Sequence, residues 1–140
     1  MPTLVDTTIR LLGQEPLAGR VPTAEQLRIA EILDAAGFAY LEVSGGGCFD
    51  AAVRRGLESP WERIRALKAR TRTPLGLALR GRFLVGSRPV DADFIRRFVA
   101  SAAESGISQD SFISMPSTIR TSIMSLQSTV CHLSRTTLWT

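Results

Sequence analysis

Apolar and polar positions along the first 107 residues predict strands and helices in alternation. Apolar runs at 4–9, 38–43 and 74–79 each end at polar or glycine-rich residues, as buried parallel strands do. Apolar residues at helical spacing follow each run and predict helices near 23–36, 59–70 and 91–106. This order predicts an α/β fold with a parallel sheet and right-handed crossovers, and it leaves a doubly wound sheet and a β/α barrel both open.

Local signals predict where the helices begin and end. Thr23 with Gln26 matches a capping box, and Ser59-Pro60-Trp61-Glu62 combines a Ser cap, a first-turn Pro and a Glu. Asp91 or Asp93 is expected to cap the last helix. Gly37 and Gly106 are expected to end the first and last of these helices. The residues expected to face inward are Ile29, Ile32, Leu33, Ala36, Trp61, Ile64, Leu67, Phe94, Phe98, Val99 and Ala102.

The segment after the second apolar run predicts a glycine turn at Gly45-Gly46-Gly47, followed by a short helix from Asp50 through Val53. The three glycines lack the Lys-Ser/Thr of a phosphate-binding loop and the Gly-x-Gly-x-x-Gly spacing of a dinucleotide site. A nucleotide-binding loop is therefore not expected here.

Composition and charge narrow the class of protein. The 140 residues are 44% hydrophobic, which is enough for one core. The net charge is +4, but the 17 Lys and Arg are spread among 13 acids without a basic run, so nucleic-acid binding is not expected. Cys48 and Cys131 lack metal-ligand spacing and are expected to be reduced thiols. With no targeting signal and no apolar run of membrane-spanning length, we expect a soluble cytoplasmic protein without a membrane partner.

The first apolar run leads into the segment Asp6-Thr7-Thr8-Ile9-Arg10-Leu11-Leu12-Gly13-Gln14. It resembles the opening strand of the biotin-dependent carboxyltransferase domains of pyruvate carboxylase, oxaloacetate decarboxylase and transcarboxylase. Their pattern is Asp-Thr-Thr, an apolar residue, Arg-Asp, two variable residues and Gln. Leu11 stands where that pattern has its second aspartate.

Three further blocks carry the same resemblance in the same order. Residues 41–50 are similar to the family's Leu-Glu-Val-Trp-Gly-Gly-Ala-Thr-Phe-Asp, residues 60–65 to Pro-Trp-Glu-Arg-Leu-Arg, and 79–81 to Leu-Arg-Gly. The resemblance covers residues 4 to about 107. It implies an N-terminal part of a TIM-type (β/α)8 barrel, about the first three βα units, with functional groups at the carboxyl ends of the strands.

The resemblance also implies a site. Arg10, Gln14 and Arg80 correspond to groups that hold a keto-acid carboxylate and stabilise its enolate, which suits guanidinium donors. The expected ligand is a small keto acid or dicarboxylate, bound weakly. A biotin carrier and self-association are the other partners considered.

The family's catalysis uses carboxybiotin and a divalent metal, held by the aspartate that Leu11 replaces, a His-x-His pair and a carbamylated Lys. The lone histidine of this chain, His132, cannot supply such a pair. Ser44, Phe83 and Ser87 also replace the family's Trp, Asn and Tyr. We therefore expect no metal, no cofactor and no intact catalytic residues in this chain, and no activity of the chain alone.

Residues 108–140 differ in composition from everything before them. Fourteen of them are Ser or Thr, none is Gly or Ala, and Asp110 is the only acid. One codon choice for 110–125, read in another frame, gives the Ala-Leu-Asn-Asp motif that the family has at this offset. The sequence thus predicts an irregular tail arising from a frameshift near 108–110, which a single-base change restoring the family sequence in the coding DNA would test. A genuine disordered tail is the alternative.

Taken together, these patterns predict a truncated carboxyltransferase-like protein whose ancestral reaction is carboxyl transfer between biotin and a keto acid, or oxaloacetate decarboxylation. Two alternatives stay open. One is a non-catalytic anion-binding module, or a fragment completed by a partner chain. The other is an acyl-lyase-type metal-dependent barrel, which also opens with Asp-Thr-Thr.

Overall fold

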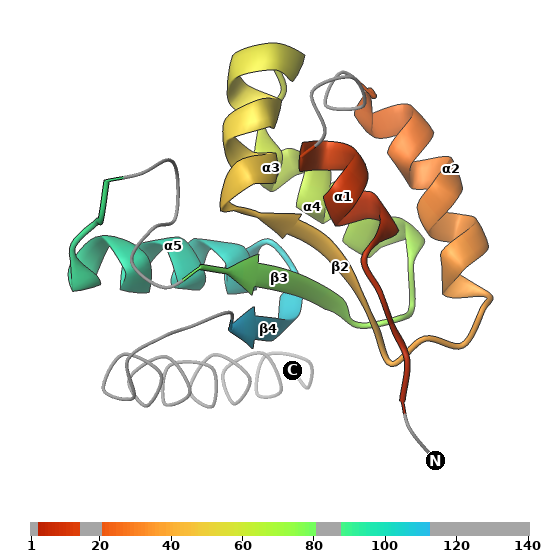
Figure 1. Ribbon diagram of the computed structural model, residues 1–140. Helices are drawn as coiled ribbons and strands as arrows, with labels where there is room; N and C mark the ends of the chain where they lie inside the picture. The colour runs from red at the N-terminus through yellow and green to blue at the C-terminus, as the bar shows by residue number, and fades with distance from the viewer. Residues whose placement is uncertain (1–2, 15–20, 81–87, 113–140) are drawn as a thin grey trace, which may run out of the picture.

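A parallel four-stranded sheet forms the centre of the molecule (Figure 1). The computed structural model describes residues 3–14, 21–80 and 88–112, the last four by their backbone alone. The strands are β1 (Val5–Asp6), β2 (Tyr40–Gly45), β3 (Leu75–Leu79) and β4 (Ile107–Phe112). They lie side by side in chain order, and all three pairings are parallel.

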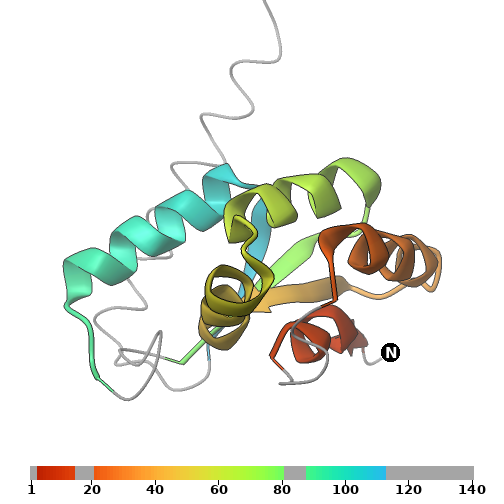
Figure 2. The same cartoon turned by 90° about the horizontal axis from the view of Figure 1, so that it is seen from above.

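Three helices connect consecutive strands and cover one face of the sheet: α2 (Thr23–Asp34), α4 (Pro60–Arg70) and α5 (Ala92–Glu104) (Figures 1 and 2). A doubly wound sheet would reverse its strand order and place helices on both faces. Strands in sequential order with all the connecting helices on one side are typical of a β/α barrel. The predicted α/β fold with a partial barrel is confirmed.

The core lies between the sheet and these helices. Leu41, Val43, Leu75, Leu77 and Leu79 alternate along β2 and β3 toward Ile64, Leu67, Ile95, Phe98 and Val99. The alternate positions of β2 and β3 carry Glu42, Ser44, Gly76 and Ala78, all of them buried as well. Both faces of β2 and β3 are therefore buried, and the face turned away from the core carries small or polar residues.

The opening of the chain is helical where a longer strand was expected. β1 ends at Asp6, and the helix α1 (Thr8–Gln14) begins two residues later. The Asp6 carboxylate accepts hydrogen bonds from the Thr8 N–H and the Thr8 hydroxyl, both at 2.9 Å. Such a turn satisfies the first donor of α1 and ends the strand. α1 lies on the side of the sheet away from α2, α4 and α5 (Figure 2).

The predicted capping box of α2 is wrong. α2 begins at Thr23, and the residue before it, Pro22, makes no side-chain cap. Glu58, 35 positions away, accepts from both the Thr23 N–H and the Thr23 hydroxyl. The Gln26 amide instead donates to the Val21 carbonyl at 3.0 Å.

The glycine turn is also different from the prediction. The helix α3 (Gly46–Ala51) starts directly after β2, and a π-helical turn (Ala52–Gly56) continues it. Asp50 lies inside α3 and pairs with Arg54 at 2.5 Å rather than capping a helix.

The other predicted helix ends agree with the structure. Ser59 accepts from the Glu62 N–H and Asp91 from the Phe94 N–H, so Asp91 is the cap of α5. Gly37 and Gly106 have φ of 80° and 113°. Three side chains expected inside are outside, because Ile32 is 74% exposed, Phe94 is 45% exposed and Ala36 is exposed as well.

β4 crosses the boundary expected at 107/108. Its residues from Gln109 to Phe112 pair in parallel with Gly76 to Leu79, after a register shift next to Leu75. A strand was not expected after Ile107. The rest of the predicted tail, 113–140, lies outside the described residues. Among those that are described, no helix has the length and apolar character needed to cross a membrane.

Candidate functional site

Two of the predicted site residues lie together on α1. Arg10 and Gln14 are one helical turn apart, and the Arg10 Nη1 donates to the Gln14 Oε1 at 3.0 Å. α1 packs against β2, so the Arg10 side chain lies over the carboxyl end of that strand. Both residues lie on a helix, whereas the sequence placed them at the end of a strand.

Glu42 on β2 holds Arg10 from the sheet side. The Arg10 Nε lies 2.7 Å from the Glu42 Oε2, and the two side chains are 20% and 8% exposed. The Nε–H nevertheless has no aligned acceptor, so the contact is an ion pair by distance and not a directed hydrogen bond. A buried carboxylate without its partner cation would be costly, so Arg10 and Glu42 depend on each other.

Sequence reasoning did not assign a role to Glu42. The sequence marks Glu42 only as the single carboxylate of the apolar run 38–43. Its neighbours Leu41 and Val43 face the core. A charged residue is almost never fully buried unless it is paired.

The glycines around β2 allow α1 and α3 to approach closely. A Cβ on Gly47 would lie 3.1 Å from the Gln14 Nε2, and a Cβ on Gly13 would lie 3.3 Å from the Cys48 Cβ. A Cβ on Gly45 would lie 2.9 Å from the Ala78 carbonyl oxygen of the next strand. These glycines therefore position Arg10 and Gln14 by close packing.

Cys48 is buried behind Arg10. Its thiol donates to the Arg10 carbonyl oxygen at 3.1 Å. Burial raises the pKa of the Cys48 thiol to about 11, although the Arg10 charge acts to lower it. A thiol with this pKa stays protonated at neutral pH.

Arg80 follows β3 directly and is exposed. It forms no hydrogen bond or ion pair with any described residue, so the structure joins Arg10 with Gln14 but not with Arg80. In the sheet, Gly45 pairs with Ala78, two residues before Arg80. Because extended chain spans at most about 3.5 Å per residue, the Arg80 Cα lies within about 7 Å of the Ala78 Cα. Phe83 and Ser87 lie outside the described residues.

The metal position of the resemblance does not fit a metal. Leu11 lies next to Arg10 on α1, is 48% exposed, and offers no oxygen, nitrogen or sulfur from its side chain. Across residues 3–14, 21–80 and 88–108, whose side chains are described, no group of three or more His, Cys, Asp and Glu could hold a metal ion. His132 and Cys131 lie outside this part of the chain.

Comparison with known proteins assigns the family. No family model matches the sequence. A pyruvate carboxylase subunit from Methanocaldococcus jannaschii is 48% identical over 108 residues, which is 76% of this chain and 19% of that protein. Its counterpart in Methanothermobacter thermautotrophicus is 41% identical over 105 residues, 74% of this chain and 18% of that protein. The matched part of the chain belongs to the carboxyltransferase family.

Solved structures of this family have the same fold. The carboxyl transferase domain of Rhizobium etli pyruvate carboxylase is 33% identical in sequence. The match covers 79% of this chain and 19% of the Rhizobium etli chain. Its TM-score is 0.70 in the structure with 3-hydroxypyruvate and 0.69 in the structure with pyruvate and biocytin. The carboxyltransferase-like chain described here thus spans about a fifth of the length of the proteins it matches.

Proposed function

We propose that this chain is a non-catalytic carboxyltransferase homologue that keeps a keto-acid-binding rim. The observation that carries the proposal is the Arg10 guanidinium, held between Glu42 and Gln14 at the carboxyl end of β2, with Leu11 beside it. The cation for a carboxylate is present, while the position for the metal ligand is apolar. The Rhizobium etli domain was solved with pyruvate and biocytin, so we take a small keto acid or dicarboxylate as the ligand.

The chemistry of the side chains separates binding from catalysis. Arg10 and Arg80 can donate to a carboxylate without any metal, because guanidinium pairs with carboxylate directly. Hard divalent cations need oxygen ligands, which the Leu11 side chain cannot provide. Binding is therefore expected to be weak and independent of metal.

The first prediction is that the chain has no metal-dependent carboxyl-transfer or decarboxylase activity. Oxaloacetate decay with the purified chain and Mg²⁺ or Mn²⁺ should equal decay in buffer with the same ion. Leu11→Asp is a useful companion variant, since it replaces the apolar side chain by a carboxylate. Metal-dependent turnover above the buffer rate by the natural sequence would refute the proposal.

The second prediction concerns binding at the rim. Arg80→Ala should weaken binding of pyruvate or oxalate by about 1.5 to 3 kcal/mol, the range for a hydrogen bond to a charged group. Arg65→Ala is a matched control, because Arg65 is exposed on α4 and has no hydrogen bond or ion pair to the described residues. Equilibrium dialysis with labelled pyruvate measures both, and equal affinity of Arg80→Ala and the natural chain would show that Arg80 is not part of the site.

A further inference from the structure

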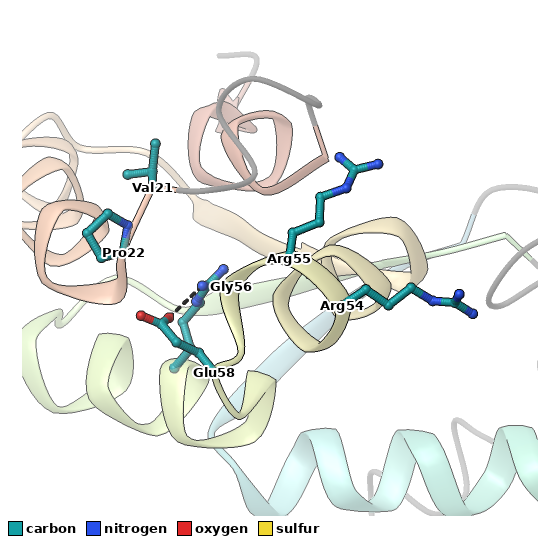
Figure 3. Close-up of a pocket in the computed structure, with 7 residues that line it drawn as sticks. Val21, Pro22, Arg54, Arg55, Gly56 and Glu58 are labelled. Carbon is teal, nitrogen blue, oxygen red and sulfur yellow. Dashed lines mark hydrogen bonds and ion pairs between the residues drawn. The ribbon is translucent and has the colours of Figure 1, made fainter.

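A cavity lies away from the rim site, between the start of α2 and the π-helical turn (Figure 3). Its volume is about 420 Å³, within the usual range for pockets that bind small molecules. The lining residues are Val21, Pro22, Arg54, Arg55, Gly56, Glu58 and Arg63. The rim residues Arg10, Gln14, Glu42 and Arg80 are not among them. The three arginines and one carboxylate of the cavity give the lining a net charge of +2.

These charges are not all available to a ligand. Arg54 pairs with Asp50 at 2.5 Å, and Figure 3 shows its side chain pointing away from Val21 and Pro22. Arg55 comes from the same turn, is exposed, and forms no hydrogen bond or ion pair with the described residues. Arg55 is therefore the cation that can turn toward a ligand, since exposed side chains change rotamer within nanoseconds.

Arg63 supplies a second, fixed guanidinium. It is only 7% exposed, its Nε donates to the Thr23 Oγ1 at 3.0 Å, and its Nη2 donates to the Glu58 Oε2 at 2.6 Å. The remaining nitrogen, Nη1, has no acceptor among the described residues. One carboxylate is thus already bound on one side of this guanidinium.

Gly56 lines the cavity beside the Arg63 Nη2, the nitrogen that also binds Glu58. A Cβ at Gly56 would lie 3.7 Å from the Arg63 Nη2, which is ordinary van der Waals contact. Its φ lies outside the left-handed region, so the backbone does not require glycine there. A side chain at this position would cover the guanidinium and fill the cavity.

We propose that this cavity binds the phosphate group of a small phosphorylated molecule between Arg55 and Arg63. The two arginines come from different elements, the π-helical turn and α4, so the ligand must present acceptor oxygens in more than one direction. A tetrahedral phosphate does this with three or more acceptor oxygens, whereas a carboxylate offers two oxygens in one plane. The cavity also has room for an organic group attached to the phosphate.

Equilibrium dialysis of the full chain tests the proposal, with inorganic phosphate and glycerol 3-phosphate as probes at constant ionic strength. Arg55→Ala should lower the affinity about tenfold or more, as expected when a charged donor is lost. Gly56→Leu should abolish binding without changing any charge. Arg65→Ala removes the same charge elsewhere, and Arg80→Ala alters only the rim, so neither should change phosphate affinity.

The outcomes are distinct. Tighter binding of glycerol 3-phosphate supports a phosphorylated metabolite, and equal binding of the two probes supports phosphate itself as the recognised group. Unchanged affinity in both Arg55→Ala and Gly56→Leu would overturn the proposal. So would equally effective competition by malonate, or a loss in Arg80→Ala, because phosphate would then occupy no phosphate-selective site or would bind at the rim.

Discussion

The Glu58 side chain joins three segments of the chain. Its carboxylate accepts from the Thr23 N–H at 3.3 Å, from the Thr23 hydroxyl at 2.5 Å and from the Arg63 Nη2 at 2.6 Å. Because the first N–H groups of a helix have no partner within it, Glu58 acts as the cap of α2. It also couples α2 to α4 through Arg63.

This contact predicts how stability depends on pH. Burial acts to raise the pKa of Glu58, but the hydrogen bonds from Arg63 and Thr23 outweigh it and hold the pKa below its usual value. A depressed folded-state pKa contributes stability that is fully present above the unfolded value, about 4.3 for Glu, and is lost as pH falls through the folded value. Glu58→Gln should therefore lower the free energy of unfolding by about 1 kcal/mol at pH 7, typical of a lost cap.

Urea unfolding at pH 7 and at pH 3.5 measures this effect. The difference between the natural chain and Glu58→Gln should shrink as the pH falls toward and through the lowered folded-state pKa of Glu58. Glu62→Gln, an exposed carboxylate in the first turn of α4, is the control and should show a smaller effect at both values. A Glu58→Gln difference that is the same at both pH values would contradict this assignment.

At the scale of elements, Gly45 sets how closely β2 and β3 approach. Its φ is −178°, which any residue adopts, so the need for glycine comes from the contact alone. A Cβ would lie 2.9 Å from the Ala78 carbonyl oxygen, and backbone cannot move aside as a flexible side chain can. Gly45→Ala should destabilise the protein by about 1 to 3 kcal/mol, the range for overpacking.

Thermal or urea unfolding of Gly45→Ala, with Gly56→Ala as its control, measures this contact. A Cβ at Gly56 meets only the Arg63 Nη2 at 3.7 Å. Gly56→Ala should be neutral or slightly stabilising, since Ala is preferred to Gly in a helix. Equal stability of the two variants would mean that the strands can separate at Gly45 without cost.

The elements that the sequence predicted well are those defined by neighbouring residues. The Ser59 and Asp91 side chains each accept a hydrogen bond from the backbone N–H three residues later. The apolar residues that alternate along β2 and β3 are the ones buried in the core. α1 and the capping partner of α2 were not predicted, because they depend on contacts distant in sequence. Glu58 reaches Thr23 across 35 positions, and α1 packs on α3 through Gly13 and Gly47.

The candidate site divides in the same way. Arg10 and Gln14 were found through the resemblance, and their contact follows from one helical turn. Glu42 was not predicted as a site residue, because its ion pair with Arg10 forms only when β2 lies beneath α1. Ile32 and Phe94 fit a helical period but lie outside the core, since periodicity gives the spacing of an apolar face and not its neighbours.

At the scale of the whole molecule, the sheet formed by the described residues is open along both outer strands. Among the described residues β1 pairs only with β2, and β4 only with β3. A complete β/α barrel has no such edges, because its sheet closes on itself. The outer strands therefore present unpaired N–H and C=O groups that can pair with another chain.

Apolar side chains are exposed on the β1 side of the molecule. Leu4 is 69% exposed and Val5 is 36% exposed, next to or within β1. Ile32, at 74%, projects from α2, the last helix of the layer on that side (Figures 1 and 2). In a closed barrel the next strand and helix would lie here.

The last prediction is that the isolated chain self-associates through this β1 side. An unpaired strand edge supplies backbone hydrogen bonds, and Leu4 and Ile32 supply apolar area, so two copies together remove both from water.

Light scattering coupled to size exclusion should give a mass above that of the monomer, rising with concentration. Leu4→Lys with Ile32→Lys should shift the population toward monomer, because charge at an exposed edge opposes pairing. Glu62→Gln with Glu104→Gln changes the net charge by the same amount at exposed positions of α4 and α5, so this control should leave association unchanged. A monomer at every concentration would contradict this prediction, because the edge of β1 and its apolar side chains would then stay solvated without recruiting a second copy.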